Sequence, residues 1–135
     1  KVCQALDAIF EEVCLKEVQV LHKSGRPQEF RSKKNFHFIA STPSLERMNL
    51  EADLVIGSFG VALVERLIQH IPCVNFLVVD NQMDFSRIFQ NDDLHRFYGD
   101  LRPQSIIKIQ EVLRREIQRL NTVITQNPKC TCGID

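Results

Sequence analysis

The order of apolar and polar positions predicts a strand, a helix and a second strand in the middle of the chain. Residues 54–56 (Leu-Val-Ile) are a short apolar run typical of a fully buried strand, and the two glycines in residues 57–60 interrupt it. Apolar residues then recur at helical spacing from Val61 to Gln69, and Pro72 ends that pattern. Residues 73–79 form a second apolar run. We therefore expect a glycine-containing turn between a buried strand and a helix.

The flanking segments continue the alternation of strands and helices. The pattern predicts a helix over residues 1–16, strands over 18–21 and 36–39, a short helix from Ser44, a helical segment over 85–89 and a long helix from about 102 to 126, and it leaves 94–100 ambiguous. Such alternation is the signature of a doubly wound parallel sheet, so the fold class is α/β and Rossmann-like, with helices on both faces. We expect one domain over residues 1–126 and a flexible tail over 127–135.

The first predicted element is unusual for this fold. A doubly wound domain normally opens with a strand, but residues 1–16 carry a helical stripe of apolar side chains. We infer that the first strand is left off or supplied elsewhere, as in a fragment or in the second half of a larger protein.

The long helix before the tail carries an apolar stripe at intervals of seven, with Ile106, Leu113 and Leu120 as its markers. A stripe of this kind is typical of a helix that packs across its own sheet. Because it extends over about three heptads, a homodimer formed through this helix is the alternative interpretation.

Composition excludes some classes of binding partner and indicates the cellular compartment. The 135 residues include 17 basic and 17 acidic side chains, so the formal charge is zero and nothing favours nucleic acid as a partner. The sequence holds no apolar run of the roughly 20 residues that cross a bilayer, so we expect no transmembrane segment. An odd number of cysteines without framework spacing predicts reduced thiols in the cytoplasm, with Cys3 and Cys14 in the core. Cys130 and Cys132 are close, but no second pair matches them, so we predict no metal.

The turn before the central helix is the best candidate for a binding site. In a parallel sheet, ligands bind beyond the carboxyl ends of the strands, where backbone N–H groups at a helix start favour phosphate or diphosphate. We therefore place phosphate near the turn made by Ser58, Phe59, Gly60 and Val61. Glu65, one helical turn further on, has a carboxylate that can accept hydrogen bonds from ribose hydroxyls. The alternatives are a solvated Glu65, and a Gly60 needed only for close packing.

Two further loops offer polar groups at the same predicted edge. Asn81 and Gln82 follow the second central strand, where they form a turn or contact a ligand. His22, Lys23 and Arg26 follow the strand over 18–21. His22 has an ordinary pKa near ~6.5, so it can serve as an acid or base or contact phosphate, and the two cations can neutralise a diphosphate. The alternative without a function is a basic turn whose side chains are solvated.

The ordered set of motifs resembles a known family. The strand ending in Phe38-Ile39, the segment Ala52 to Ile56, the run from Ser58 through Gly60 to Glu65, Pro72 and Gln82 are similar to the carboxyl-terminal half of glycosyltransferases with two Rossmann-like domains. Within this GT-B class, the chain is most similar to the peptidoglycan N-acetylglucosaminyltransferases and to the nucleotide-sugar hydrolases of nonulosonic acid synthesis. The similarity is best over residues 36–90.

The resemblance implies a donor-binding domain for a nucleotide diphosphate sugar. In such families the base lies near the residue that matches Ile39, the ribose is held by the residue that matches Glu65, and the diphosphate lies against the helix that starts near Gly60. Residues matching Asn81 and Gln82 face the sugar. The catalytic base usually comes from an amino-terminal domain, so this resemblance implies such a domain or a partner subunit, no cofactor, and a cytoplasmic protein that can lie at the inner face of a membrane.

Two other functions stay open. A nucleotide-sugar hydrolase or epimerase would need an acid or base from these loops, and His22 is then the candidate catalytic residue. A non-catalytic interaction module would keep the fold without the ligand. Phe59 and Val61 favour the module, because Phe59 stands where the family usually has a small residue and Val61 where it often has a hydroxyl.

Overall fold

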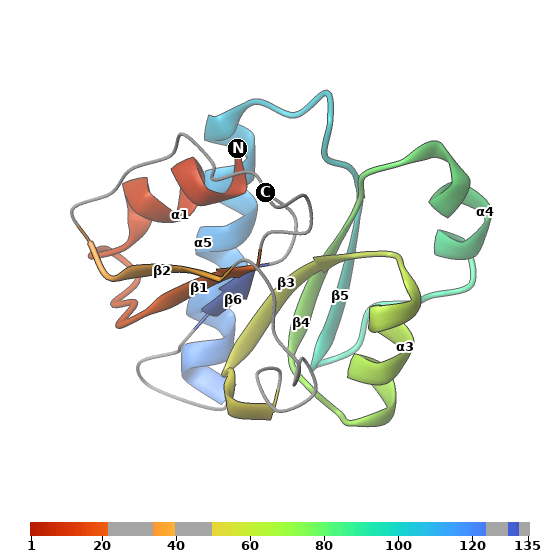
Figure 1. Ribbon diagram of the computed structural model, residues 1–135, viewed down its shortest axis with the longest axis horizontal. Coiled ribbons are helices and arrows are strands. Elements are labelled where there is room, and N and C mark those ends of the chain that lie inside the picture. The colour runs from red at the N-terminus through yellow and green to blue at the C-terminus, as the bar shows by residue number, and fades with distance from the viewer. Residues whose placement is uncertain (22–33, 40–49, 124–129, 133–135) are drawn as a thin grey trace.

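The computed structural model describes residues 1–21, 34–39, 50–123 and 130–132. It is an α/β arrangement of parallel strands and helices (Figure 1). The strands are β1 (Val18–Leu21), β2 (Phe36–Ile39), β3 (Leu54–Ser58), β4 (Cys73–Leu77), β5 (His95–Asp100) and β6 (Cys130–Cys132). The helices are α1 (Val2–Ile9), α3 (Val61–Ile68), α4 (Met83–Ser86) and α5 (Ile106–Val123), with a 3-10 helix η1 (Asp80–Gln82).

The strands form one sheet in the order β2-β1-β6-β3-β4-β5, and all the described pairings are parallel. The last strand, β6, joins a two-stranded part, β1 and β2, to a three-stranded part, β3 to β5. The chain moves outward in one direction from β1 to β2 and in the other from β3 to β5. This reversal is typical of a Rossmann-like sheet, which brings the carboxyl ends of β1 and β3 to one edge.

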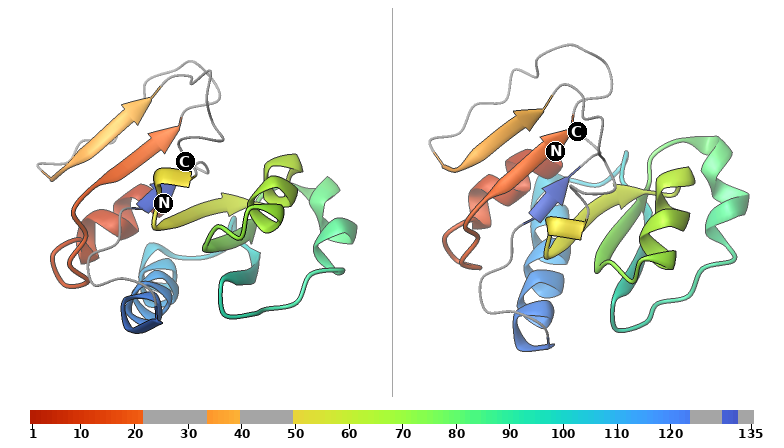
Figure 2. Two further views of the ribbon diagram at one scale, coloured as in Figure 1. Left: turned by 90° about the horizontal axis from the view of Figure 1, so that it is seen from below. Right: turned by 60° about the horizontal axis from the view of Figure 1, so that its bottom comes forward.

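Helices cover both faces of the sheet, as Figure 2 shows. Along β3, Leu54 and Ile56 pack in the cluster with α1 and α5, whereas Val55 packs in the cluster with Leu63 of α3. Successive side chains of a strand point to opposite faces, so an uninterrupted apolar run is what a strand covered on both sides requires. The predicted fold class is therefore present in the described residues.

The long helix α5 packs against its own sheet. Ile109, Leu113, Ile117 and Leu120 are all at most 1% exposed and belong to the larger core cluster, together with Leu6 of α1. Fully burying a side chain of this size stabilises the fold by about 1.5–3 kcal/mol. A homodimer through α5 would need the same stripe, and these four side chains are already covered within the chain.

The expected tail over 127–135 is wrong for residues 130–132. These residues form β6, which pairs with β1 on one side and with β3 on the other. Sequence periodicity could not reveal this strand, because three residues between polar segments are too few to show a period. A strand from the end of the chain therefore lies between β1 and β3, and the absence of a first strand stays a prediction.

Several element boundaries and packing assignments differ from the prediction. The helix expected over residues 1–16 ends at Ile9, and Cys14 is exposed with a φ of 59°, whereas Cys3 is buried as expected. The second central strand ends at Leu77, and the ambiguous segment 94–100 contains β5. Val64 and Ile68, which belong to the apolar pattern that predicts α3, are 40% and 72% exposed. The helix expected from Ser44 lies outside the described residues.

Candidate functional site

A crevice opens at the carboxyl ends of β3 and β4, where the sequence predicts ligand binding. It has a volume of about 520 Å³ and lies between the start of α3 and the η1–α4 segment. Its walls are Phe59, Gly60, Val64, Asn81, Gln82 and Phe85. Four of these six residues were predicted to bind a ligand, so the fold brings the β3 and β4 loops together as expected.

Gly60 precedes α3 and leaves the first turn of that helix uncapped. Its backbone is extended, with φ −120° and ψ −170°, and no side chain of a described residue caps the helix start. The first N–H groups of a helix have no acceptor within the helix. The N–H of Leu63 donates to the Gly60 carbonyl over 3.0 Å, so the N–H groups before it are the ones left for an external acceptor. A Cβ atom added at Gly60 would have Gln82 Nε2 at 3.9 Å and Ser58 Oγ at 4.0 Å as its nearest neighbours, which are ordinary van der Waals contacts.

The side chain of Gln82 is held in the crevice by the backbone. Its Oε1 accepts a hydrogen bond from the N–H of Val78 over 3.2 Å, which leaves the amide nitrogen on the side of Gly60. Asn81 is exposed next to it. The two amides offer both donors and acceptors, which suit hydroxyl or phosphate oxygens.

The inner wall of the crevice is aromatic and part of the core. Phe59 is only 2% exposed, and its ring lies 5.6 Å from the ring of Phe97 and 5.9 Å from that of Phe89. The rings of Phe85 and Phe89 meet edge to face at 4.9 Å. Phe59 therefore fixes the shape of the crevice, and little of its own surface is open to a ligand.

A buried arginine supports the turn from below. Arg66, 5% exposed, donates from Nη2 to the carbonyl of Ser58 over 3.0 Å and to Oδ1 of Asn75 over 2.9 Å. Asn75 in turn donates to the carbonyl of Arg96 over 3.1 Å. Gly57 leaves room for this guanidinium, because a Cβ there would lie 2.6 Å from Arg66 Nη2. The network ties α3 to β3, β4 and β5 just beneath the predicted phosphate turn.

Burial shifts the pKa values of Arg66 and Cys73, the two ionisable groups of this network. Burial lowers the pKa of Arg66, and the neighbouring Cys73 thiol partly opposes this shift. Burial also raises the pKa of Cys73, although Nδ2 of Asn75 lies 3.2 Å from its sulfur. Cys73 is therefore a neutral thiol in the core and not an activated nucleophile.

Sequence reasoning missed Arg66 and Asn75. A usable signal was present, since Arg66 lies between the apolar residues Leu63 and Leu67 on the face of α3 that meets the sheet. A long cation on such a face must find buried acceptors, and an asparagine inside an apolar strand can supply one.

The other predicted site residues either are absent from the described lining of this crevice or lie outside the described residues. Glu65 is exposed on α3, and its neighbour Val64 lines the crevice instead. Ile39 is the last residue of β2, which β1 and β6 separate from β3. Val61 is the first residue of α3. His22, Lys23 and Arg26 lie outside the described residues.

Comparison with family models, with curated proteins and with solved structures finds no match to this chain. None of the helices in the described ranges has the length and apolar character needed to span a bilayer. The resemblance to glycosyltransferases therefore stays a prediction, and the assignment of a function depends on the chemistry of the crevice.

Proposed function

We propose that this chain is the donor-binding domain of a nucleotide-sugar glycosyltransferase, and that the crevice between α3 and η1 holds the diphosphate and sugar. The observation that carries the proposal is the uncapped first turn of α3, which opens at Gly60 onto a crevice lined by Asn81 and Gln82. Its position beyond the carboxyl ends of parallel strands supports the proposal, because that edge is where such sheets bind nucleotides.

The groups of the crevice match the parts of this ligand. Backbone N–H groups at the start of α3 would donate hydrogen bonds to the diphosphate as it gains negative charge in its role as leaving group. The amides of Asn81 and Gln82 would bind sugar hydroxyls. A volume of about 520 Å³ lies within the ~300–1,000 Å³ that is usual for small-molecule sites.

The rest of the reaction would need groups from elsewhere. Among the described residues that line the crevice, none is cationic. We therefore assign charge neutralisation to Lys23 and Arg26 of the loop after β1. We further propose a cytoplasmic protein whose catalytic base belongs to an amino-terminal domain or partner subunit.

Calorimetry with uridine diphosphate and cytidine diphosphate tests the proposal. We expect one of them to bind, and we expect Gly60→Ala to weaken that binding at least tenfold, because its methyl group would lie beside the helix start where we place the diphosphate. Ile68→Ala is the matched control on the same helix, since Ile68 is exposed and lies outside the crevice lining. Equal affinity in wild type and Gly60→Ala would place the nucleotide elsewhere.

A non-catalytic interaction module is the second candidate. The apolar character of Phe59, Val64 and Phe85 favours it, because such walls suit an apolar side chain of a partner as well as a sugar. Absence of heat with both nucleotides would favour the module. If a nucleotide sugar binds and its sugar is released or epimerised without an acceptor, a hydrolase or epimerase is favoured. In that case His22→Gln should abolish turnover of the nucleotide sugar but not its binding.

A further inference from the structure

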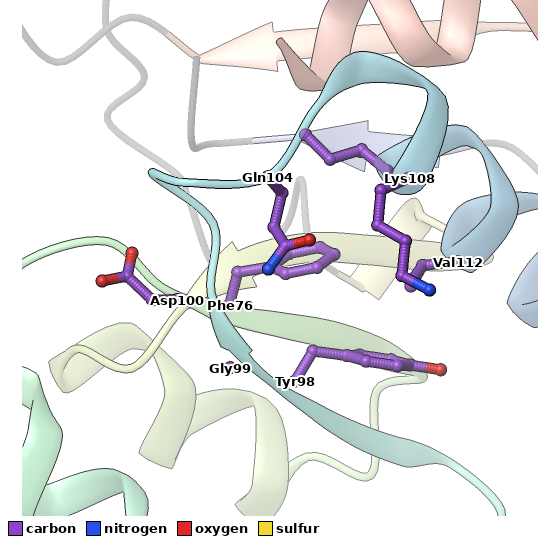
Figure 3. Close-up of a pocket in the computed structure, with 8 residues that line it drawn as sticks. Phe76, Tyr98, Gly99, Asp100, Gln104, Lys108 and Val112 are labelled. Atoms are coloured by element: carbon purple, nitrogen blue, oxygen red, sulfur yellow. The ribbon is translucent and has the colours of Figure 1, made fainter.

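A second cavity lies on the opposite face of the sheet, between the carboxyl ends of β4 and β5 and the start of α5 (Figure 3). It has a volume of about 100 Å³. Its principal walls are Phe76, Tyr98, Gly99, Gln104, Lys108 and Val112. Gly99 leaves it open to one side, because a Cβ atom added there would have no neighbour within 4 Å.

The floor of this cavity is aromatic and rigid. The rings of Phe76 and Tyr98 are stacked, with centroids 5.6 Å apart and planes 27° apart. The Tyr98 hydroxyl donates a hydrogen bond to Glu116, which is 1% exposed. Arg96 and Arg119 each pair with Glu116 at 3.2 Å, so its buried carboxylate is fixed in place. A side chain whose orientation is fixed in this way presents a ligand with a preorganised surface.

The opposite wall carries positive charge. Lys108 and Gln104 extend over the cavity from the start of α5, as Figure 3 shows. The first turn of an 18-residue helix adds the positive end of its dipole, and Ser105 Oγ caps only the N–H of Lys108 among the described contacts of that turn. The Lys1 ammonium lies close by, donating to the carbonyls of Arg102 over 2.7 Å and of Gln104 over 2.9 Å.

The acidic groups near this wall are paired with cations. Asp100 lines the cavity, and Arg102 pairs with it at 2.8 Å and with Asp80 at 2.7 Å. The hydrogen bonds from Arg102 lower the pKa of Asp100, which therefore stays ionised and paired. Glu111 lies 3.6 Å from the Lys108 ammonium, and both side chains are more than half exposed. Exposed ion pairs of this kind contribute little to stability. Lys108 can therefore leave Glu111 and pair with another anion at a small cost in free energy.

We propose that this cavity binds a small carboxylate with a flat apolar body. The flat part would lie on Tyr98 and Phe76, against Val112, and the carboxylate would meet Lys108, the Gln104 amide and the first turn of α5. A cavity of about 100 Å³ is smaller than the apolar cavity of ~150 Å³ that binds benzene, so the body it takes is at most one six-membered ring, with the carboxylate at the open side. The proposal is independent of the donor site, because the two cavities lie on opposite faces and share no described lining residue.

Amide-detected NMR titration with sodium benzoate and with benzamide tests the proposal on the whole chain. Benzamide has the same shape without the charge. We expect benzoate to shift the amide signals of Gly99, Gln104 and Lys108 with a Kd in the millimolar range, and benzamide to bind at least fivefold more weakly. Lys108→Met should weaken benzoate binding about tenfold, whereas Lys108→Arg should retain most of it. Gly99→Leu should block the cavity.

Two controls separate this site from nonspecific binding. Arg87→Met removes an exposed cation at the end of α4, on the other face, and should leave benzoate affinity unchanged. The far-ultraviolet spectrum and melting temperature of Gly99→Leu show whether that variant is folded, and Lys108→Met tests the same cavity at an exposed position. Equal affinity for benzoate and benzamide, or benzoate shifts that persist in both Lys108→Met and Gly99→Leu, would overturn the proposal.

Discussion

The guanidinium of Arg66 donates a hydrogen bond to the side-chain oxygen of Asn75 over 2.9 Å, and both residues are buried between α3 and the sheet. Arg66 donates to this amide and to the Ser58 carbonyl, both neutral, and it also interacts with the Cys73 thiol and with the exposed Glu65. A buried cation that depends on neutral acceptors is sensitive to the loss of either one, because its charge has already left water.

Asn75→Ala should therefore destabilise the protein more than Arg66→Met. The first change removes an acceptor and leaves the buried charge, which we expect to lower the free energy of unfolding by about 2–4 kcal/mol. The second change removes the charge and keeps an apolar chain of similar length, so we expect a loss of about 1–2 kcal/mol. Urea unfolding of both variants provides the comparison. A smaller loss in Asn75→Ala would show that the guanidinium finds water instead.

The two glycines of the β3–α3 turn should respond differently to alanine. Gly57→Ala places a methyl group 2.6 Å from Arg66 Nη2, so the guanidinium must move, and we expect a loss of about 1–3 kcal/mol. Gly60→Ala meets nothing closer than 3.9 Å and has an ordinary extended backbone, so we expect a change within about 0.5 kcal/mol. Thermal unfolding measures both.

The Gly57 effect should depend on Arg66. In an Arg66→Met background, the cost of Gly57→Ala should fall by more than half, because the flexible methionine can move aside. Additive effects in this double-mutant cycle would show that Gly57 matters for its backbone alone.

Thr131→Pro tests whether residues 130–132 are a central strand or a tail. Thr131 lies between Gln19 of β1 and Val55 of β3, and a proline inside a sheet removes a ladder hydrogen bond and crowds its neighbours. We expect a loss of about 3 kcal/mol or more in urea unfolding. Thr131→Val keeps the strand geometry and should be nearly neutral. If proline and valine had equal, small effects, β6 would not form in solution.

Alkaline pH should destabilise the protein through Tyr98. Burial, with the hydrogen bond to Glu116, raises the pKa of this hydroxyl above its ordinary value of 10.0. The unfolded chain then ionises first, so the contribution of Tyr98 to stability is complete below pH ~10 and is lost as the pH rises through the higher folded pKa. Tyr98→Phe should flatten the decline in melting temperature above pH ~10. A decline of the same steepness in this variant would assign it to other groups.

Residues at the crevice should affect nucleotide binding according to where they lie. Gln82 lines the crevice, where we propose that its amide binds sugar hydroxyls, so Gln82→Ala should weaken binding of the nucleotide diphosphate sugar about tenfold. Glu65 is exposed and outside that lining, so we expect Glu65→Ala to weaken binding less than Gln82→Ala does. Calorimetry ranks the two, and a larger loss in Glu65→Ala would restore the ribose contact that the family resemblance implies.

Elements with a clear period were predicted well. The strands β1 and β2 have the predicted bounds, and the predicted helix over 61–69 differs from α3 by one residue. Burial of a strand or helix on one face gives a periodic apolar pattern, and burial on both faces gives an unbroken apolar run, so both can be recognised in the local sequence. The segment 94–100 was ambiguous because β5 is an edge strand whose side chains are mostly half-buried.

The rest depended on contacts between distant residues. Nothing near residue 131 indicates that it pairs with β1 and β3, and nothing near Arg66 names Asn75 as its partner. Four crevice residues, Phe59, Gly60, Asn81 and Gln82, were predicted correctly because parallel topology fixes which loops meet. The direction of the Glu65 side chain depends instead on the rotation of α3 about its own axis. A helical wheel gives that rotation only when the apolar stripe is fully buried, and Val64 and Ile68 are not.

The order in which the strands are synthesised differs from their order in the sheet. A ribosome makes the β1–β2 and β3–β5 parts first and the three residues that lie between them afterwards. During translation the two parts therefore expose facing strand edges, which can pair with other chains until β6 emerges. The nascent protein would depend on chaperones during this interval, and a stop codon before residue 130 would make the exposure permanent.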